Sequence, residues 1–452
     1  MITIDNNTTI EQLKLNPAQV LVLGFGALIL IGATFLNLPV ASVNGKSIGF
    51  IDALFTSASA VCVTGLVVVN TAAHWSMFGK IVILILIQVG GLGFMTMATL
   101  VALILGRKIT LKDRLIIQEE LNQFTLSGLV KLTKYVIVST IMLESLGAFF
   151  LSLKFIPIYG PSTGIWFGIF HAISAFCNAG FDLIGSSMEP FVDSPIVNIT
   201  IGLLVIIGGL GYTVYIDITT QKNYKRYSLH TKLVLIVTAI LLVIGFFAIF
   251  FLEYNNPDTL GSLSFGGKLM AALFQSIVPR TAGFNSINMG AVTSTSAFII
   301  IILMFIGGSP GSTAGGIKTT SIGAIVLAII SVVRGKNDVE ILKRRISIEL
   351  VFRALAVTGI AFCIVSIVTM ILTITESGAS FLDIVFETVS AFATVGLSRG
   401  ITPSLTIIGR LVITITMFIG RLGPLTMAFA FAKKRNNNKG VYRYAEERII
   451  VG

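Results

Sequence analysis

Charged residues are scarce in this chain. Asp, Glu, Lys and Arg together make up 12% of its 452 residues, whereas a soluble domain carries about 25%. Hydrophobic residues take their place, at 54% of the chain and with a mean hydropathy of +0.93. The shortage of charge excludes an ordinary water-soluble protein, and the composition predicts an integral membrane protein.

Cysteine is scarce as well. Cys62, Cys177 and Cys363 lie in apolar stretches, and an odd number without paired spacing excludes a disulfide framework or a zinc site. We therefore expect three free, buried thiols. The three histidines lack the spacing of metal or haem ligands, and no Rossmann fingerprint is present. We expect no enzyme and no cofactor in this chain, so any nucleotide control would come from a partner.

Apolar stretches of spanning length, about 20 residues, recur along the chain, and we expect eight spans. Twenty-three of the 32 Lys and Arg residues lie at the chain ends or in alternate connections. The positive-inside rule then predicts a multi-pass protein of the cell membrane with both termini in the cytoplasm. It also explains the net charge of +11 without a nucleic-acid partner. The expected spans cover roughly 16–40, 79–105, 134–153, 197–217, 231–252, 296–333, 351–374 and 407–432.

A short pattern recurs in the connections that are poor in basic residues. Its four copies read FTSASAVCVTGL (55–66), FHAISAFCNAGF (170–181), LFQSIVPRTAGF (273–284) and FETVSAFATVGL (386–397). The shared glycines are Gly65, Gly180, Gly283 and Gly396, separated by 115, 103 and 113 residues. A phenylalanine precedes each glycine by ten residues, or by nine in the third copy.

A second pattern follows each of these glycines. It reads QVGGLGF, IIGGLGY, FIGGSPG and FIGRLGP, and it places Gly91, Gly209, Gly308 and Arg421 25 to 29 residues after the first pattern's glycine. Two patterns that recur four times in order indicate an internal repeat. The predicted units are residues 1–128, 129–228, 229–345 and 346–452, the third with a broken second span and the fourth with a cytoplasmic tail.

Each unit also contains an apolar stretch of about 13 residues that ends shortly before the glycine of its first pattern. As a helix it would be about 20 Å long, too short to cross a bilayer, so we expect it to re-enter the membrane. Two crossings and one re-entry return the chain to its starting side, and successive units are therefore parallel. The predicted fold is an all-α membrane protein in which four repeats, each with two spans and one re-entrant loop, surround a central pore.

The glycine segments suit a cation that has lost its water. Rings of backbone carbonyls can replace a hydration shell, and glycine adopts backbone angles that direct carbonyls inward. The segments carry no ring of acidic residues. The expected ion-binding residues are Cys62, Val63, Thr64 and Gly65; Cys177, Asn178, Ala179 and Gly180; Arg280, Thr281, Ala282 and Gly283; and Ala393, Thr394, Val395 and Gly396.

With these motifs the whole chain resembles the membrane subunit of the Trk/Ktr/HKT superfamily of potassium transporters, most closely the Ktr type. That family has four M1–pore helix–M2 repeats in one chain and one selectivity-filter glycine per repeat, which map onto the four glycines above. In some plant relatives a serine at the first of these positions accompanies sodium preference, whereas all four positions are glycine here. The resemblance implies potassium as the transported ion, a homodimer in membrane lipid, and a cytoplasmic ring of nucleotide-binding RCK/KTN-type regulatory subunits.

The third unit carries an unusual insertion, GGSPGSTAGGIKTT, inside an apolar stretch. Residues 296–333 would form a continuous helix of about 57 Å against a hydrocarbon core of about 30 Å, so the stretch must break. The alternative is an extramembrane linker between two spans. The resemblance implies an intramembrane gate below the filter. The gate residues would be Gly308, Ser309, Gly311, Ser312, Thr313, Ala314, Gly315 and Gly316, and we expect few packing contacts to hold them.

Four further polar residues lie in apolar surroundings. An ionisable residue there is a functional candidate. The resemblance implies that Arg421 faces the pore and contacts the gate, with a structural arginine behind the pore as the alternative. We expect Arg280 to pair with Asp182 or Glu387 and Glu144 to be a structural helix contact. Lys318 is assigned to neither the gate nor the cytoplasmic side.

The function predicted from these features is potassium uptake through a gated pore. The alternative is an ion-coupled secondary carrier with alternating access. Unitary currents would favour the pore, and saturating exchange with fixed stoichiometry would favour the carrier.

Overall fold

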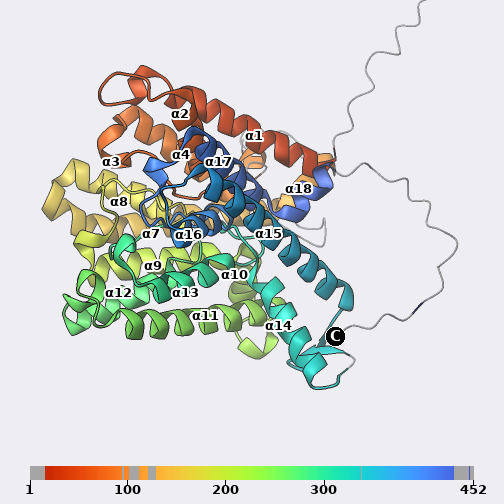
Figure 1. Ribbon diagram of the computed structural model, residues 1–452. Coiled ribbons are helices and arrows are strands. Elements are labelled where there is room, and N and C mark those ends of the chain that lie inside the picture. The colour runs from red at the N-terminus through yellow and green to blue at the C-terminus, as the bar shows by residue number, and fades with distance from the viewer. Residues whose placement is uncertain are drawn as a thin grey trace, which may run out of the picture.

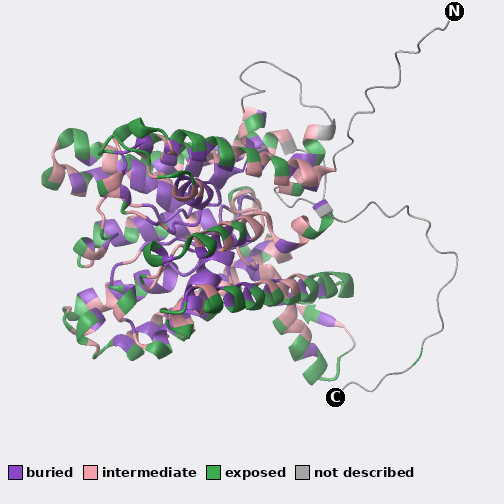
Figure 2. Ribbon diagram, turned by 45° about the horizontal axis from the view of Figure 1, so that its top comes forward, coloured by how far each residue is buried: buried purple, intermediate pink, exposed green. Residues whose placement is uncertain are grey.

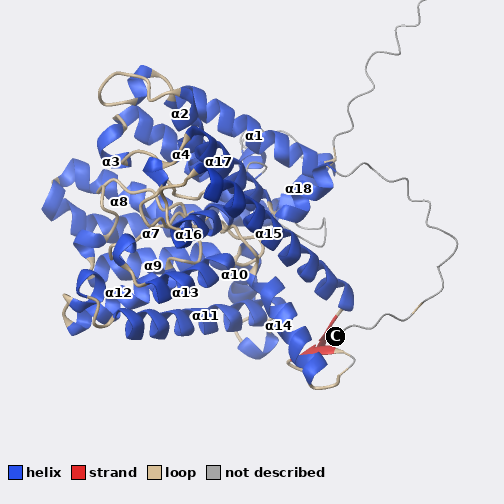
Figure 3. Ribbon diagram, in the orientation of Figure 1, coloured by secondary structure: helices blue, strands red, loops and turns tan. Residues whose placement is uncertain are grey.

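The computed structural model describes residues 16–93, 96–100, 111–120, 129–336, 338–431 and 447. The described chain is helical apart from one antiparallel hairpin, β1 (Val339–Ile341) with β2 (Arg344–Ile346). Figure 3 shows these two strands at the edge of the molecule, away from the helical body.

Four long helices are each followed by a shorter one that packs against them. The long helices are α1 (Pro17–Leu36), α7 (Leu129–Tyr159), α11 (Leu229–Glu253) and α15 (Ile348–Thr375). The shorter partners are α2 (Phe50–Val61), α8 (Pro161–Phe176), α12 (Phe265–Ile277) and α16 (Phe381–Phe392). Each short helix therefore occupies a stretch where the sequence predicts a re-entrant helix, and Figure 1 shows the pairs in chain order.

The remaining helices complete the four groups. They are α3 (Thr71–His74), α4 (Met77–Leu92), α6 (Leu111–Glu120), α9 (Pro195–Leu210), α10 (Tyr212–Thr220), α13 (Ser294–Phe305), α14 (Thr319–Val333), α17 (Ile407–Leu422) and α18 (Pro424–Phe431). Short turns are η1 (Pro39–Ala41), η2 (Glu189–Phe191), η3 (Tyr224–Arg226), η4 (Pro257–Gly261), η5 (Met289–Ala291) and η6 (Thr402–Ser404).

The packing closes into a ring. Helix α4 packs against α8, α9 against α12, α13 against α16, and α17 returns to α2. Each contact joins one group to the next along the chain, and the last joins the fourth group to the first. Figure 1 shows α17, near the C-terminal end of the described chain, close to α2 from its beginning. The short helices are thereby surrounded by the other elements.

The phenylalanines that mark the repeats lie inside this ring. Phe55, Phe170, Phe274 and Phe386 are each at most 1% exposed. They come from equivalent places in α2, α8, α12 and α16, so their burial accounts for their recurrence at a nearly fixed distance from the glycine. Figure 2 shows buried residues gathered at the centre of the molecule.

The long helices expose apolar side chains outward. Met142 on α7, Phe251 on α11 and Ile374 on α15 are 70%, 70% and 77% exposed. A soluble protein would not expose so many large apolar groups, whereas lipid accepts them. In the most apolar 18-residue stretch of each long helix, only 22–33% is buried within the chain.

By length and composition, four described helices can cross a membrane, or up to six if each sharply bent pair counts as one span. Helices α9 and α10 bend by 94° at Gly211, and α17 and α18 bend by 94° at Gly423. The spans expected over 197–217 and 407–432 therefore coincide with sharply bent helix pairs, a feature that the sequence did not predict. Gly93, Gly211 and Gly423 have φ angles of 91°, 92° and 85°, which lie outside the right-handed helix.

An ion pair joins the last group to the first. The Arg410 Nη1 atom of α17 donates to the Asp52 Oδ1 atom of α2 at 2.5 Å, and both side chains are about one-fifth exposed. Partial burial and a charge-assisted hydrogen bond should make this pair stronger than an exposed one.

We expect Asp52→Asn to lower the melting temperature in detergent by about 2–6 °C, because a hydrogen bond between charged groups contributes about 1.5–3 kcal/mol. The matched control is Glu340→Gln, which breaks a Lys336–Glu340 pair whose side chains are about half exposed. Thermal unfolding of both variants checks the prediction, and equal melting temperatures would contradict it.

Candidate functional site

The four glycine segments share one backbone conformation. Each short helix ends at its segment, and the second residue and the glycine of every segment have positive φ. Glycine adopts such angles without strain, whereas the second residue of each segment is a non-glycine residue at positive φ. The φ angles are 56° and 93° at Val63 and Gly65, 61° and 69° at Asn178 and Gly180, 76° and 72° at Thr281 and Gly283, and 52° and 91° at Thr394 and Gly396.

The four segments meet one another. A Cβ atom added at Gly180 would lie 2.9 Å from the Ala282 carbonyl oxygen, and one added at Gly283 would lie 2.7 Å from the Val395 carbonyl oxygen. Added at Gly65 or Gly396, it would overlap the carbonyl oxygen of Ala179 or Thr64. Each glycine therefore faces the carbonyl of the next segment, and the contacts close a ring. The structure brings together all four segments that the sequence selected.

Serines at the ends of three short helices support the ring. The Ser59 and Ser390 hydroxyls accept hydrogen bonds from Gly65 N and Gly396 N at 3.0 and 3.1 Å. The Ser174 hydroxyl donates to Phe181 O at 2.8 Å. The sequence analysis missed these serines, although each precedes its glycine by six residues in a shared Ser-Ala pair.

The third segment is supported differently. Ile277 stands in place of the serine, and Ala282 N donates to Val278 O at 3.0 Å. Arg280 is buried, and its Nη2 atom donates to the Thr238 hydroxyl at 3.4 Å. The expected pairing of Arg280 with Asp182 or Glu387 is wrong: Asp182 accepts from two backbone amides and Glu387 from two hydroxyls.

The glycine-rich insertion forms a closed loop between α13 and α14. Gly307 N donates to Ile317 O at 3.0 Å, and Thr319 N donates to Gly308 O at 3.0 Å. Ile306 and Ile317 also pair as an isolated parallel bridge. The ends of the loop are thus held together, and residues 308–316 project from that junction.

The loop is fixed to the second group of helices. Ser309 N donates to Gly209 O at 2.9 Å, Tyr212 N donates to Gly311 O at 2.9 Å, and the Thr313 hydroxyl donates to Gly208 O at 3.0 Å. Ser309, Thr313 and Ala314 are at most 2% exposed. The expectation that little packing holds this loop is wrong, because carbonyls of the neighbouring GGLG pattern anchor it.

The loop also lies directly against the fourth glycine segment. A Cβ atom added at Gly315 would overlap the Thr394 hydroxyl, and one added at Gly316 would lie 3.2 Å from the Ala393 Cβ atom. Glycine at both positions allows this close approach of the loop to the ring.

Arg421 joins the loop to the first group. Its Nη1 atom donates to the Thr313 carbonyl, and its Nη2 atom donates to the carbonyls of Gly90 and Gly91, the latter at 3.0 Å. The Lys318 Nζ atom donates to Ala314 O at 2.6 Å, so this lysine also belongs to the loop. Arg421 and Lys318 thus both bind backbone carbonyls of the loop, and Arg421 also binds carbonyls of α4.

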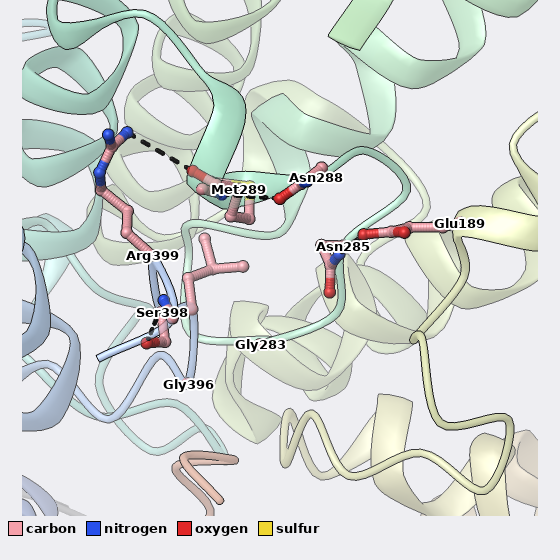
Figure 4. Close-up of a pocket in the computed structure, with 11 residues that line it drawn as sticks. Glu189, Gly283, Asn285, Asn288, Met289, Gly396, Ser398 and Arg399 are labelled. Carbon is pink, nitrogen blue, oxygen red and sulfur yellow. Dashed lines mark hydrogen bonds between the residues drawn. The ribbon is translucent and has the colours of Figure 1, made fainter. Parts of the chain in front are cut away.

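A cavity of about 180 Å³ lies beside the ring, between the third and fourth groups. Figure 4 shows its lining, with Gly283 and Gly396 on one side and Asn285 turned toward Glu189. Asn285 Nδ2 donates to Glu189 Oε1 at 2.7 Å, and burial raises the pKa of the Glu189 carboxyl. The Arg399 side chain extends toward Asp383 and the Val292 carbonyl, at 2.6 and 3.0 Å.

The arrangement provides oxygen ligands for a hard cation. Among the described residues, no cluster of three His, Cys, Asp or Glu side chains could hold a metal ion. The buried hydroxyls of Thr64 and Thr394 have no partner in the described structure.

Cys62 and Cys177 are buried as predicted, but Cys363 is exposed on α15, so the prediction of three buried thiols is wrong for Cys363.

Comparisons with known proteins show the family and relatives of this chain. The sequence profile of the TrkH family, described as cation transport protein, matches residues 14–441. Ktr system potassium uptake protein B of Bacillus subtilis is 46% identical, with all of both chains covered. Potassium/sodium uptake protein NtpJ of Enterococcus hirae is 42% identical over 97% of this chain and 98% of its own. The crystal structure of the potassium transporter TrkH from Vibrio parahaemolyticus is similar in fold, with a TM-score of 0.73 at 18% identity over 93% of this chain and 86% of its own.

Proposed function

Because the chain belongs to the TrkH family of cation transport proteins, we propose that it takes up potassium across the cell membrane through a gated, K⁺-selective pore. The names of its full-length relatives support potassium as the substrate. The family transports ions, and the chain is accordingly a multi-pass membrane transporter and not an enzyme.

The proposed architecture has four parallel repeats and eight spans, with both termini in the cytoplasm. Each repeat contributes a long helix as M1, a short helix as pore helix, and a bent or broken second span as M2. The four similar pairings of long and short helices and the closed ring of contacts support this assignment. The short helices direct their partly negative C-terminal ends at the ring, which favours a cation.

The ring of four glycine segments carries the proposal. Each glycine faces a carbonyl oxygen of the next segment, so K⁺ would bind among the carbonyls of residues 62–65, 177–180, 280–283 and 393–396. The loop 308–316 would be the gate, because it packs against Thr394 on one side and is anchored to Gly208 and Gly209 on the other.

Flux measurements in proteoliposomes test this function. We expect uptake of K⁺ and Rb⁺ in preference to Na⁺, driven by the ion's own gradient. Unitary currents in a planar bilayer would support the pore. Saturating exchange with a fixed stoichiometry and no unitary currents would instead establish an ion-coupled carrier, and equal K⁺ and Na⁺ flux would refute the selective filter.

Arg421→Ala is expected to raise K⁺ flux. The variant removes a charged donor from Thr313 and from the carbonyls of Gly90 and Gly91, and each such bond contributes about 1.5–3 kcal/mol. It also removes a positive charge that repels cations near the path. Rb⁺ uptake normalised to the amount of folded protein measures the effect.

The matched control is Arg421→Lys, which keeps the charge but lacks the planar fork of donors that spans the separate carbonyls. We expect its flux to lie between those of wild type and Arg421→Ala. A well-folded Arg421→Ala protein with wild-type flux would assign Arg421 a structural role behind the pore.

We further propose a homodimer that binds a cytoplasmic ring of RCK/KTN-type nucleotide-binding subunits. The hairpin β1–β2 offers exposed basic side chains for such a partner: Arg344 and Arg345 are exposed on it, and Arg345 also pairs with Asp338 at 3.0 Å. Co-purification of this chain with and without Arg344→Glu and Arg345→Glu would test the contact, and unchanged binding would exclude the hairpin.

A further inference from the structure

A polar cluster lies behind the second glycine segment. Glu144 of α7 is 7% exposed, and its Oε2 atom accepts a hydrogen bond from Gln88 Nε2 of α4 at 3.1 Å. The Cys177 Sγ atom lies 3.7 Å from Gln88 Oε1 and 3.9 Å from Glu144 Oε1, within range of a weak thiol hydrogen bond. Cys177 is the first residue of the second segment. The side chains of Gln88 and Glu144, from other helices, therefore contact the ring at the Cys177 thiol.

This cluster breaks the fourfold pattern. In the aligned sequence patterns Gln88 corresponds to Ile206, Phe305 and Phe418, so the other repeats place apolar side chains at this position. Phe305 there packs near Phe392, with ring centroids 6.5 Å apart. Because apolar side chains fill the equivalent positions in the other three repeats, the fold does not require a polar side chain at position 88.

The Cys177 side chain is confined on its other side as well. A Cβ atom added at Gly91 would lie 2.6 Å from Cys177 Sγ, so the α4 backbone passes directly against the thiol. The next residue, Asn178, has a φ of 61°, and its side chain lies 3.2 Å from the Thr281 hydroxyl of the third segment. A change in the position of Cys177 would therefore be passed through Asn178 to the third segment.

A buried carboxyl in a membrane protein is costly and marks a functional position. No salt bridge among the described residues involves Glu144, and its observed partners are the amide and the thiol beside the ring. The hydrogen bond from Gln88 is the helix contact that the sequence predicts, and the contact with Cys177 adds a partner in the ring itself.

We propose that Glu144 and Gln88 are positioning residues that set ion selectivity by fixing Cys177, and through it the carbonyls of the second segment. The inference rests on the proposed function, since it assigns these residues to the same filter. They hold Cys177 in position by hydrogen bonding and not by charge. A neutral side chain of the same shape at position 144 should therefore keep the selectivity.

The ratio of K⁺ to Na⁺ flux in proteoliposomes tests the proposal. We expect Glu144→Leu and Gln88→Leu each to lower this ratio by at least threefold, and Glu144→Gln to restore it, because an amide oxygen still accepts from Gln88. Ser145→Leu is the matched control, since Ser145 is exposed on the same helix and outside the cluster. A flux ratio does not depend on the amount of protein, so reduced expression alone will not mimic the effect.

A double-mutant cycle separates positioning from general destabilisation. If the cluster acts through the thiol, adding Glu144→Leu to Cys177→Ala will lower the ratio no further. A full additional loss in the Cys177→Ala background would overturn the proposal, as would wild-type ratios in both leucine variants. If Glu144→Leu fails to fold, Gln88→Leu and its cycle with Cys177→Ala decide the matter. Non-selective flux of the wild-type protein would instead refute the proposed function itself.

Discussion

Replacement of Gly396 by serine should lower K⁺ over Na⁺ selectivity at least tenfold, which corresponds to about 1.4 kcal/mol. Gly396 has a φ of 91°, and a Cβ atom there would overlap the Thr64 carbonyl oxygen and lie 3.0 Å from Gly65 Cα. The fourth segment must move, or the Thr64 carbonyl must turn away from the ion path. Reversal potentials under mixed K⁺ and Na⁺ gradients measure the change.

Gly400→Ser is the matched control for backbone strain. Gly400 has a φ of 102°, yet nothing lies within 4 Å of an added Cβ atom. A selectivity change limited to Gly396→Ser therefore reports crowding of the ring. We expect losses in the same direction for serine at Gly65, Gly180 and Gly283. Unchanged selectivity in all four single variants would refute the assignment of the ring as the filter.

Deletion of Ser312 to Gly315 should raise K⁺ flux at least threefold while K⁺ preference is kept. The deletion removes Thr313, which binds Gly208 O and accepts the Arg421 bond, and Gly315, which packs against Thr394. These contacts hold the loop against the ring, and their loss should leave the path less obstructed. The bonds that join the loop ends, Gly307 N to Ile317 O and Thr319 N to Gly308 O, remain to hold α13 and α14 together.

Ser312→Ala is the control for the deletion. Among the described residues its hydroxyl bonds only within the loop, to Ser309 O at 2.6 Å and from Ala314 N at 3.3 Å, so flux should change little. We also expect the deletion variant to depend less on any regulatory subunit, since a partner acts on a gate by preferring one of its positions. Wild-type flux with intact regulation in a folded deletion variant would rule out the gate.

The recurring features of the fold could be predicted from the sequence because they depend on local pattern. The four glycines mark the ring because each adopts a positive φ, and the phenylalanines before them mark its buried surroundings because each is buried at an equivalent place. The break in 296–333 also followed from length alone. The bends at Gly211 and Gly423 were not predicted, although both glycines stand sixth in the second repeated pattern, as Gly93 does.

Contacts between distant residues were decided only by the tertiary structure. Arg421 and its acceptor Gly90 are 331 residues apart, and Arg280 and its partner Thr238 are 42 apart. Gln88, Glu144 and Cys177 come from three different helices or segments and two repeats. Composition and repetition determined the membrane class and the candidate ring, because both are properties of the chain itself. Which polar groups hold the loop and the ring depends on how the helices close around them, and that closure joins residues with no shared local pattern.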